Sequence, residues 1–264
     1  MFRSKIIVVK IGGSTLGQND TTMEDLVTLQ KKKVPVVVVH GGGNAVTEWL
    51  SRLHISTRFV QGLRVTDEDT LMVVTAVLAG LINKELVSEI SRRGGKAVGI
   101  SGADGAIVLG KNKDRELGLT AEELTVDSRL LKILLSNGYM PVIAPVCINS
   151  EPGGRQDNNL LNVNGDTIAA EIAAALDARK LIFLTDVPGI YDDSRQVITH
   201  IDGGKARNMI DTGTASGGMV AKLEAGMIAA RKVSLTRIID GRVGHALIDE
   251  IEGKGSGTTI VNRK

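Results

Sequence analysis

The sequence predicts an α/β protein, a three-layer α/β/α sandwich built on a mostly parallel central sheet. Short apolar runs rich in valine and isoleucine alternate with stretches of helical periodicity along the chain. Because these runs are continuous rather than alternating, both faces of each strand are expected to be covered, as in a parallel sheet. In open sheets of this kind ligands bind beyond the carboxyl ends of the strands, so we expect the functional residues there.

Each predicted strand is bounded by glycine, proline or polar residues. The strands are KIIVVK (5–10), PVVVVH (35–40), KAVGI (96–100), MPVIAPV (140–146), KLIFLTDV (180–187) and the weaker RIIDG (237–241). A charged excursion from about Leu109 to Val126 interrupts this pattern. We expect a hairpin in that segment.

The longest predicted helix runs from about Asp67 to Arg93. It has acids in its first turn, arginines in its last turn and glycine beyond, which are the charges and the stop signal of a capped helix. Shorter helices are predicted over residues 127–138 and 166–178. The chain contains no linker of disordered composition and no repeat of fixed period, so we expect one domain over residues 1–264 with two lobes.

The composition is that of an ordinary globular protein. Of 264 residues, 42% are apolar and 23% are charged, and the formal net charge is +2, which excludes the disordered and fibrous classes. The short basic runs lack interleaved aromatic residues, so no nucleic-acid partner is expected. A single cysteine, Cys147, cannot form an internal disulfide. No apolar run approaches about 18 residues and the N-terminal one is too short for a signal peptide, so we expect a cytoplasmic protein without a membrane partner.

Two predicted strands end in glycine-rich loops, KIGGS (10–14) and HGGGN (40–44). Glycine lets other groups approach the backbone closely, and the N–H groups of such a loop and of the helix behind it bind anions. If the two strands are neighbours, both loops face one anionic ligand. Either loop alone could also be a tight turn with a purely steric role. No G-x-x-x-x-G-K-[ST] stretch and no helix-opening G-x-G-x-x-G occurs, which argues against a P-loop protein and a dinucleotide enzyme.

Three charged residues stand at strand ends or helix starts. Lys10 ends an apolar strand at the ligand edge of the sheet, and its alternative is a lysine that extends into solvent. Lys222 follows a glycine pair near the start of a helix, where it could equally be a surface lysine. Asp166 begins an alanine-rich helix, where an N-cap or a first-turn acid is the simpler interpretation.

A series of motifs covering nearly the whole chain resembles, in the same order, the N-acetylglutamate kinases of the amino acid kinase family. The motifs are KIGGS, HGGGN, QGLRVTDEDT, INKELV, GISGADG, LNVNGDTIAAEIA, LTDVPGI, GGMVAKLEA and DGRVGHAL. The resemblance implies ATP-driven phosphorylation of the γ-carboxylate of N-acetyl-L-glutamate, the second step of arginine biosynthesis. Mg²⁺ is expected with ATP, held by phosphates and water. The acceptor carboxylate, with a free pKa of about 4.3, is already ionised, so no general base is required.

The resemblance implies a role for each charged residue. Lys10 and Lys222 resemble the lysines that neutralise the phosphate oxygens in the transition state, and Asp166 resembles the acid that holds both in place. Arg64 in GLRVTD resembles the residue that clamps the α-carboxylate of the substrate, a task suited to a guanidinium fork, and its alternative is a surface ion pair. Asn162 and Asn164 resemble the asparagines that line the substrate.

The glycines of both loops are implied to donate backbone N–H groups to the phosphoryl group in flight and to the acetylglutamate carboxylate. They are Gly12, Gly13, Gly42 and Gly43. A further set resembles the adenine-nucleotide contacts of the family: Thr185, Asp186, Val187, Gly189, Ile190 and Met219. The lobe of residues up to about 175 would then bind acetylglutamate and form the dimer, and the lobe from about 176 to 264 would bind ATP.

Two other functions stay open. One is the related kinase that phosphorylates α-aminoadipate or glutamate attached to a carrier protein. GLRVTD favours free acetylglutamate, whereas NVNGD drifts toward this alternative. The other is a catalytically inactive ligand sensor, against which the retention of Lys10, Asp166 and Lys222 argues.

The resemblance also bears on assembly. Arginine-inhibited members of the family carry an additional N-terminal helix, whereas here only nine residues precede Lys10. We therefore expect a homodimer, joined through the helix that begins at Asp67, with weak or absent inhibition by arginine. HALIDEIEGKGSGTTI (245–260) retains part of the pattern of the sensitive members.

Overall fold

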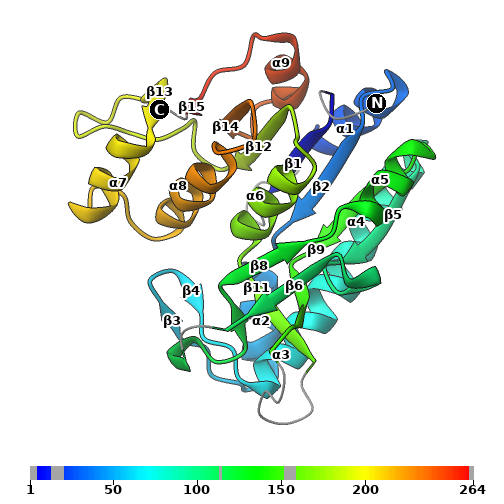
Figure 1. The fold of residues 1–264 in the computed structure, drawn as a ribbon, viewed down its shortest axis with the longest axis vertical. Coiled ribbons are helices and arrows are strands. Elements are labelled where there is room, and N and C mark those ends of the chain that lie inside the picture. Colours follow the sequence, from blue (N-terminus) through cyan, green and yellow to red (C-terminus); the bar gives the residue numbers. More distant parts are fainter. Residues whose placement is uncertain (1–4, 13–20, 113–114, 152–158, 262–264) are drawn as a thin grey trace.

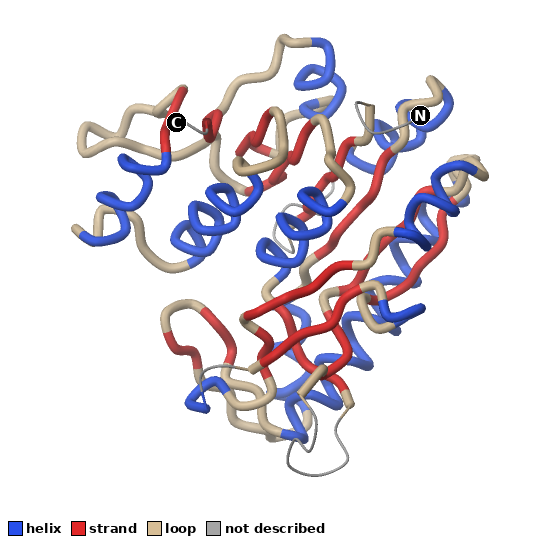
Figure 2. The backbone as a smooth tube through the Cα atoms, in the orientation of Figure 1, coloured by secondary structure: helices blue, strands red, loops and turns tan. Residues whose placement is uncertain are grey.

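The computed structural model describes residues 5–12, 21–112, 115–151 and 159–261. Strands and helices alternate along most of the chain, as the sequence predicts (Figures 1 and 2). The helices are α1 (Thr22–Lys31), α2 (Gly43–Arg52), α3 (Glu68–Thr75), α4 (Asn83–Arg92), α5 (Arg129–Ser136), α6 (Gly165–Ala175), α7 (Gly203–Asp211), α8 (Gly218–Ala229) and α9 (Ala246–Glu252). The π-helical segment η1 (Ala76–Ile82) joins α3 to α4, and η2 (Asp104–Ala106) and η3 (Arg115–Leu117) are short turns elsewhere in the chain.

The main sheet contains all the predicted strands and runs in the order β13-β15-β14-β12-β1-β2-β9-β5. Its strands are β1 (Ile7–Ile11), β2 (Val36–His40), β5 (Ala97–Ser101), β9 (Met140–Ala144), β12 (Lys180–Thr185), β13 (His200–Asp202), β14 (Leu235–Asp240) and β15 (Thr258–Val261). Neighbouring strands are parallel except β14 and β15, which are antiparallel. The mostly parallel sheet is therefore confirmed. Because β1 and β2 are neighbours, the two glycine-rich loops follow at the same edge.

Apolar side chains cover both faces of this sheet. Val8 and Val37 point into a cluster shared with α5, α6 and α8, whereas Val9 and Val38 point into a cluster shared with α1, α4 and α9. The three-layer sandwich is therefore confirmed. Since successive side chains of a strand point to opposite faces, Lys10 lies on the same face as Val8, and the residue at the end of β2 lies on the same face as Val38.

A second, five-stranded sheet was not predicted. Its order is β7-β11-β10-β6-β8, and β11 packs against α3. The strands are β6 (Val108–Lys111), β7 (Thr120–Ala121), β8 (Glu123–Val126), β10 (Val146–Asn149) and β11 (Leu160–Val163). The antiparallel pairing of β6 with β8 confirms the hairpin expected in this region. A short hairpin of β3 (Phe59–Val60) and β4 (Leu63–Arg64) lies apart from both sheets.

The long helix is continuous from Glu68 to Arg92, close to its predicted ends. Asp67 caps it, because its carboxylate accepts a hydrogen bond from the backbone N–H of Thr70 at 2.8 Å. The wide turn η1 in its middle was not predicted. Among the described residues this helix alone meets the length and composition of a membrane span, contrary to the expectation that no such run exists, yet 44% of its most apolar window is buried inside the fold.

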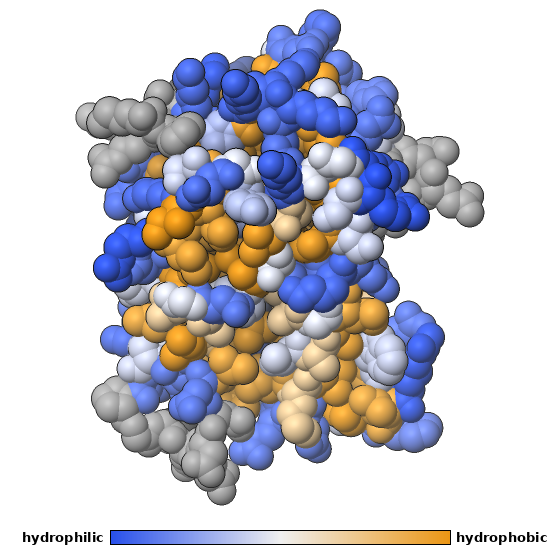
Figure 3. All heavy atoms as spheres, turned by 90° about the vertical axis from the view of Figure 1, so that its right-hand side faces the viewer, coloured by the Kyte–Doolittle hydropathy of each residue, from blue (hydrophilic) through white to orange (hydrophobic). Residues whose placement is uncertain are grey.

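One face of the molecule carries the free edge of the main sheet. There β5 pairs with β9 on one side only, between the long helix and α5. Figure 3 shows this face, with a broad band of hydrophobic residues across its middle. Met72, Leu81 and Ile133 are among the exposed large apolar side chains. At the opposite end of the sheet lie strands that follow residue 175, so one sheet joins both predicted lobes, and the boundary near residue 175 stays a prediction.

Candidate active site

A pocket of about 210 Å³ lies where β1 and β2 end. The HGGGN loop, β4, β11 and the start of α6 form its walls. Among its lining residues are Lys10, Gly42, Gly43, Arg64, Asn162, Asn164 and Asp166. The structure thus gathers the residues that the resemblance assigns to catalysis and to acceptor binding, except for Lys222, which reaches Asp166 from outside the pocket wall.

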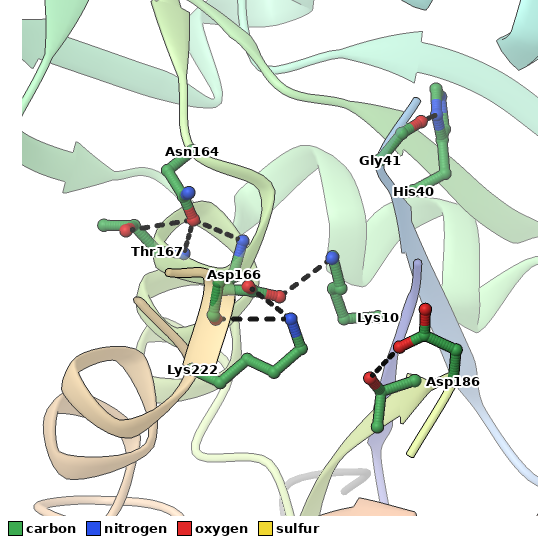
Figure 4. Close-up of polar contacts among 10 residues, drawn as sticks. Lys10, His40, Gly41, Asn164, Asp166, Thr167, Asp186 and Lys222 are labelled. Carbon is green, nitrogen blue, oxygen red and sulfur yellow. Dashed lines mark hydrogen bonds and ion pairs between the residues drawn. The ribbon is translucent and has the colours of Figure 1, made fainter. Parts of the chain in front are cut away.

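Asp166 lies between two lysines that approach from different elements (Figure 4). Its carboxylate oxygens are 2.9 Å from Lys10 Nζ and 3.4 Å from Lys222 Nζ. Lys10 comes from β1 on the face that α6 covers, and Lys222 comes from the second turn of α8. The side chains of Lys10, Asp166 and Lys222 are only 9%, 6% and 15% exposed. Neither lysine extends freely into solvent, so that alternative is wrong for both.

The charge of Asp166 is fixed by its neighbours. Burial alone would raise the pKa of this carboxyl, but the ammonium groups of Lys10 and Lys222 outweigh burial and hold the pKa below its ordinary value. Two positive charges therefore share one buried negative charge. The cluster keeps an excess of positive charge beside the pocket, which suits a strongly anionic ligand.

The start of α6 corrects one interpretation of Asp166. Asn164, not Asp166, is the N-cap of this helix, because its side-chain oxygen accepts hydrogen bonds from the N–H groups of Asp166 at 2.8 Å and Thr167 at 3.2 Å. Asp166 stands two residues further along, as a first-turn acid whose carboxylate meets the lysines.

The HGGGN loop leads directly from β2 into α2. The N–H of Gly41 continues the hydrogen-bond ladder to β1 at 2.9 Å, and α2 begins at Gly43. Gly42 has φ of +150°, and a Cβ at this position would overlap the side chains of Leu78 and Ile82. The first N–H groups of α2 lie at the positive end of the helix dipole, beside the pocket. The loop is therefore a tight steric turn and also an arrangement of donors that suits an anion.

The KIGGS loop is described only as far as Gly12. The N–H of Gly12 donates to the carbonyl oxygen of Leu184 at 3.2 Å, which links β1 to β12. Gly13 lies outside the described residues. Donation by Gly12 and Gly13 to a phosphoryl group stays a prediction.

Arg64 is held firmly inside the pocket rather than on the surface. Its guanidinium donates to Thr57 Oγ1 at 2.5 Å, to Thr47 Oγ1 at 2.7 Å and to the carbonyl oxygen of Gly43 at 3.0 Å. It also lies over the ring of Phe59, 4.7 Å from the centroid. Burial lowers its pKa. Arg64 is buried against hydroxyls, a carbonyl and a ring, so the surface ion pair is wrong and the cation faces the pocket.

Asn162 is positioned by a buried hydroxyl network that the sequence did not reveal. Its Nδ2 donates to Thr66 Oγ1 at 3.1 Å, and the hydroxyl of Thr120 lies 3.0 Å from that of Thr66. Because Nδ2 points toward Thr66, the side-chain oxygen of Asn162 remains the group available to a ligand donor.

The predicted nucleotide contacts lie on the other side of β1. Thr185 ends β12, and its hydroxyl donates to Asp186 at 3.3 Å. Ile190 is fully buried in the core, and Met219, in the first turn of α8, packs against the same core cluster. Val187 and Gly189 lie in the bend between Asp186 and Ile190. Within the described structure none of these six residues lines the pocket that holds Arg64, so their role stays a prediction.

His40 is a residue to which the sequence analysis gave no role. It ends β2, is buried, and lies with Nδ1 2.8 Å from the carbonyl oxygen of Gly41 and Nε2 3.1 Å from Nδ2 of Asn83 (Figure 4 shows the first contact). Burial, together with the charges of Lys10 and Lys84, lowers the pKa of His40 to about 4. A polar residue at the end of a run of valines was a signal for His40, but nothing in the sequence pointed to Asn83.

Comparison with known proteins agrees with this geometry. Residues 5–240 match the amino acid kinase family. The chain is 40% identical over 258 residues to an acetylglutamate kinase of Dehalococcoides mccartyi (strain ATCC BAA-2266 / KCTC 15142 / 195), covering 98% of this chain and 95% of that protein. It is 42% identical over 272 residues to an acetylglutamate kinase of Synechococcus sp. (strain RCC307), covering 100% and 90%. The solved structure of smu.665 from Streptococcus mutans UA159 has a TM-score of 0.82 at 25% identity, covering 98% of this chain and 99% of that one. The chain therefore belongs to the amino acid kinase family.

Proposed function

We propose that this protein transfers the γ-phosphoryl group of ATP to the γ-carboxylate of N-acetyl-L-glutamate, the second step of arginine biosynthesis. The observation that carries the proposal is the buried Lys10–Asp166–Lys222 cluster beside a pocket that also holds Arg64. Relatives named acetylglutamate kinase, about 40% identical over nearly the whole chain, support the same reaction.

The reaction demands charge cancellation more than acid–base chemistry. An ionised carboxylate attacks a triphosphate, so negative charge accumulates between acceptor and donor, and both must be held in line. Lys10 and Lys222 would neutralise the phosphate oxygens, and Asp166 would keep their ammonium groups in place. Loss of one such preorganised charge typically costs roughly 3 to 4 kcal/mol of transition-state stabilisation.

The acceptor would lie in the pocket with its ends held by different groups. Arg64 would bind the α-carboxylate with the guanidinium N–H groups that face the pocket, and the oxygen of Asn162 would accept the amide N–H of the acetylated nitrogen. Gly42 and Gly43 would donate backbone N–H groups to the γ-carboxylate and to the phosphoryl group in flight. Asn164 would line the substrate with the part of its side chain that the helix cap leaves free.

ATP would lie toward β12 and α8. Thr185, Asp186, Val187, Gly189 and Met219 offer backbone and polar groups there, and Ile190 offers an apolar wall from the core. Among the described residues no group of three or more His, Cys, Asp or Glu side chains is arranged to hold a metal ion. Mg²⁺ would be carried by the phosphates of ATP and by water.

The related kinase for carrier-bound substrates is the less favoured candidate, because the curated relatives are named for acetylglutamate. A coupled ADP-release assay with MgATP separates the two. We expect turnover with N-acetyl-L-glutamate and none with glutamate, N-acetylaspartate or α-aminoadipate. Absence of turnover with every free amino acid would overturn the proposal and favour a carrier-bound substrate or a sensor.

We also propose that the chain forms a homodimer through the face shown in Figure 3. A free sheet edge at β5 and exposed apolar side chains on the long helix and α5 favour association there. Light scattering should give twice the chain mass, and Leu81→Lys should lower it. Tyr191→Lys, an equally exposed residue near the opposite edge of the sheet, is the control. A monomer or a hexamer would contradict the proposal.

The protein is also proposed to work in the cytoplasm. Its composition and the burial of its most apolar helix inside the fold support this location. Fractionation of cells that produce the tagged chain tests it. Recovery in the membrane fraction after a salt wash would contradict it.

A further inference from the structure

A buried polar network connects the HGGGN loop to the long helix. We propose that His40 is a positioning residue, whose ring fixes the Gly41–Gly42 peptide so that the N–H of Gly42 is directed into the pocket, and that Asn83 fixes the ring in turn. This rests on the proposed function, because it assigns Gly42 a donor role in phosphoryl transfer. It adds two residues that do not touch the substrate themselves.

The contacts of His40 determine where its proton lies. A carbonyl oxygen can only accept, so Nδ1, 2.8 Å from the oxygen of Gly41, must carry the hydrogen. An amide nitrogen can only donate, so Nε2, 3.1 Å from Nδ2 of Asn83, must be bare. The ring is therefore the neutral Nδ1–H tautomer.

The orientation of the Asn83 amide is fixed independently of His40. Its Nδ2 also donates to the carbonyl oxygen of Val142 at 2.9 Å, and its Oδ1 accepts from Lys84 Nζ at 2.9 Å. Turning the amide over would place its oxygen against a carbonyl and its NH₂ against an ammonium. Protonation of the ring would likewise set two donors against each other, and the positive charges of Lys10 and Lys84 would oppose it.

Peptide geometry converts this contact into a direction for the Gly42 N–H. In a trans peptide the C=O of one residue and the N–H of the next point in opposite directions. His40 pulls the Gly41 carbonyl toward the long helix, because the side chain at the end of β2 faces α4. The N–H of Gly42 then points toward the other face of the sheet, where Lys10 and the pocket lie.

The wide turn η1 brings the long helix close enough to do this. Leu78 and Ile82, both in η1, pack where a Cβ of Gly42 would stand, and Asn83 follows directly. On β5, Gly99 leaves space that a Cβ would take from the Asn83 amide. π-helical turns occur frequently at functional sites. Here η1 packs against the HGGGN loop and places Asn83 within hydrogen-bond distance of His40.

Substitutions of His40 separate the two contacts of the ring. Asparagine puts an amide nitrogen where Nδ1 stands, glutamine reaches instead to the place of Nε2, and leucine removes both. We expect His40→Asn to keep most of the wild-type kcat. His40→Gln and His40→Leu should lower kcat roughly 100-fold with little change in KM for either substrate, because a misdirected donor weakens the transition state alone. His200→Asn, on an exposed ring, is the matched control.

A purely structural role gives a different pattern. The kcat values would then follow the loss of thermal stability, and His40→Asn would be no better than His40→Gln. That result, or wild-type kcat in His40→Leu, would overturn the proposal. If His40→Leu does not fold, the comparison of the asparagine and glutamine variants decides.

A spectroscopic measurement tests the network without relying on activity. In protein with ¹⁵N-labelled histidine, the signals missing from His40→Asn belong to His40. At pH 7 they should report a protonated Nδ1 and a bare Nε2, and Asn83→Ala should weaken that preference. An imidazolium or an Nε2–H tautomer would overturn the network. Absence of turnover in the wild type with the expected tautomer present would instead fault the proposed function.

Discussion

Lys10 and His40 occupy corresponding places on neighbouring strands, yet their surroundings are opposite. Each stands near the end of a buried run, and the register places Lys10 beside Val39 and His40 beside Ile11. Lys10 faces α6 and meets a buried carboxylate, whereas His40 faces α4 and meets a carbonyl and an amide. A buried carboxylate offsets the cost of burying the ammonium of Lys10, whereas a carbonyl and an amide do not offset the cost of burying an imidazolium at His40. In the proposed site Lys10 therefore supplies a positive charge, whereas His40 positions the backbone of the HGGGN loop.

The strongest test of this contrast removes the charged member. Lys10→Met should lower kcat roughly 100- to 1,000-fold, since a preorganised positive charge beside the phosphates is lost. ADP release at saturating substrates measures it, with Lys205→Met on the exposed side of α7 as the control. Wild-type kcat in Lys10→Met would remove Lys10 from the catalytic cluster.

The surroundings of His40 and of Lys10 should give different dependences of the free energy of unfolding on pH. The folded pKa of His40, about 4, lies below the ordinary 6.5, so the unfolded chain takes up the proton first as pH falls. The contribution of neutral His40 to the free energy of unfolding is complete above pH 6.5. It should decrease by up to about 3 kcal/mol as pH falls toward 4. Asp166, whose pKa is lowered, keeps its contribution through this range.

Urea unfolding at a series of pH values measures this loss. His40→Asn should flatten the slope between pH 6.5 and 4, because the titrating ring is gone. An unchanged slope would show that a group other than His40 causes the loss.

A smaller effect is expected where charge and geometry combine. Arg64→Lys keeps the charge but loses the planar fork, so its contacts with Thr47, Thr57 and the acceptor carboxylate cannot all form. We expect kcat/KM for N-acetyl-L-glutamate to fall roughly 10- to 100-fold, mainly through KM. Arg52→Lys on the exposed face of α2 is the matched control. An unchanged KM would place the acceptor elsewhere.

The last prediction compares alanine substitutions at two adjacent glycines of the HGGGN loop. At Gly42 a Cβ would overlap the long helix and the backbone has φ of +150°, whereas nothing lies within 4 Å of a Cβ at Gly43. Gly42→Ala should cost about 1 to 3 kcal/mol of the free energy of unfolding. Gly43→Ala should leave it nearly unchanged. Equal losses in urea unfolding would contradict the close approach of the helix to the loop.

The parts of the molecule that could be predicted are those determined by local sequence patterns. Continuous apolar runs predicted every described strand of the main sheet except β13 and β15, and the acid at Asp67 marked the start of the long helix. The position of Lys10 at a strand end followed from the same pattern. The resemblance supplied the roles of Asp166 and Lys222, and the structure added their contact.

The rest depends on contacts between distant segments. The second sheet pairs strands as short as Thr120–Ala121 with partners far along the chain, and such strands are too brief to show a period. Asn83 and His40 are 43 residues apart, and the local sequence around either residue does not indicate their contact. The sequence left Asp166 as either the N-cap of α6 or a first-turn acid, and only the backbone shows that Asn164, two residues earlier, is the cap.

The wide turn of the long helix also sets the phase of its side chains. Those that face the interior recur every fourth residue, at Val74, Leu78, Ile82, Leu86 and Ile90. In an α-helix four residues overshoot a full turn by about 40°, so such a stripe would wind around the axis within a few turns. One additional residue in a wider turn takes back roughly 100° of this drift. The side chains that follow η1, Asn83 among them, therefore keep their direction toward β2 although one more residue precedes them.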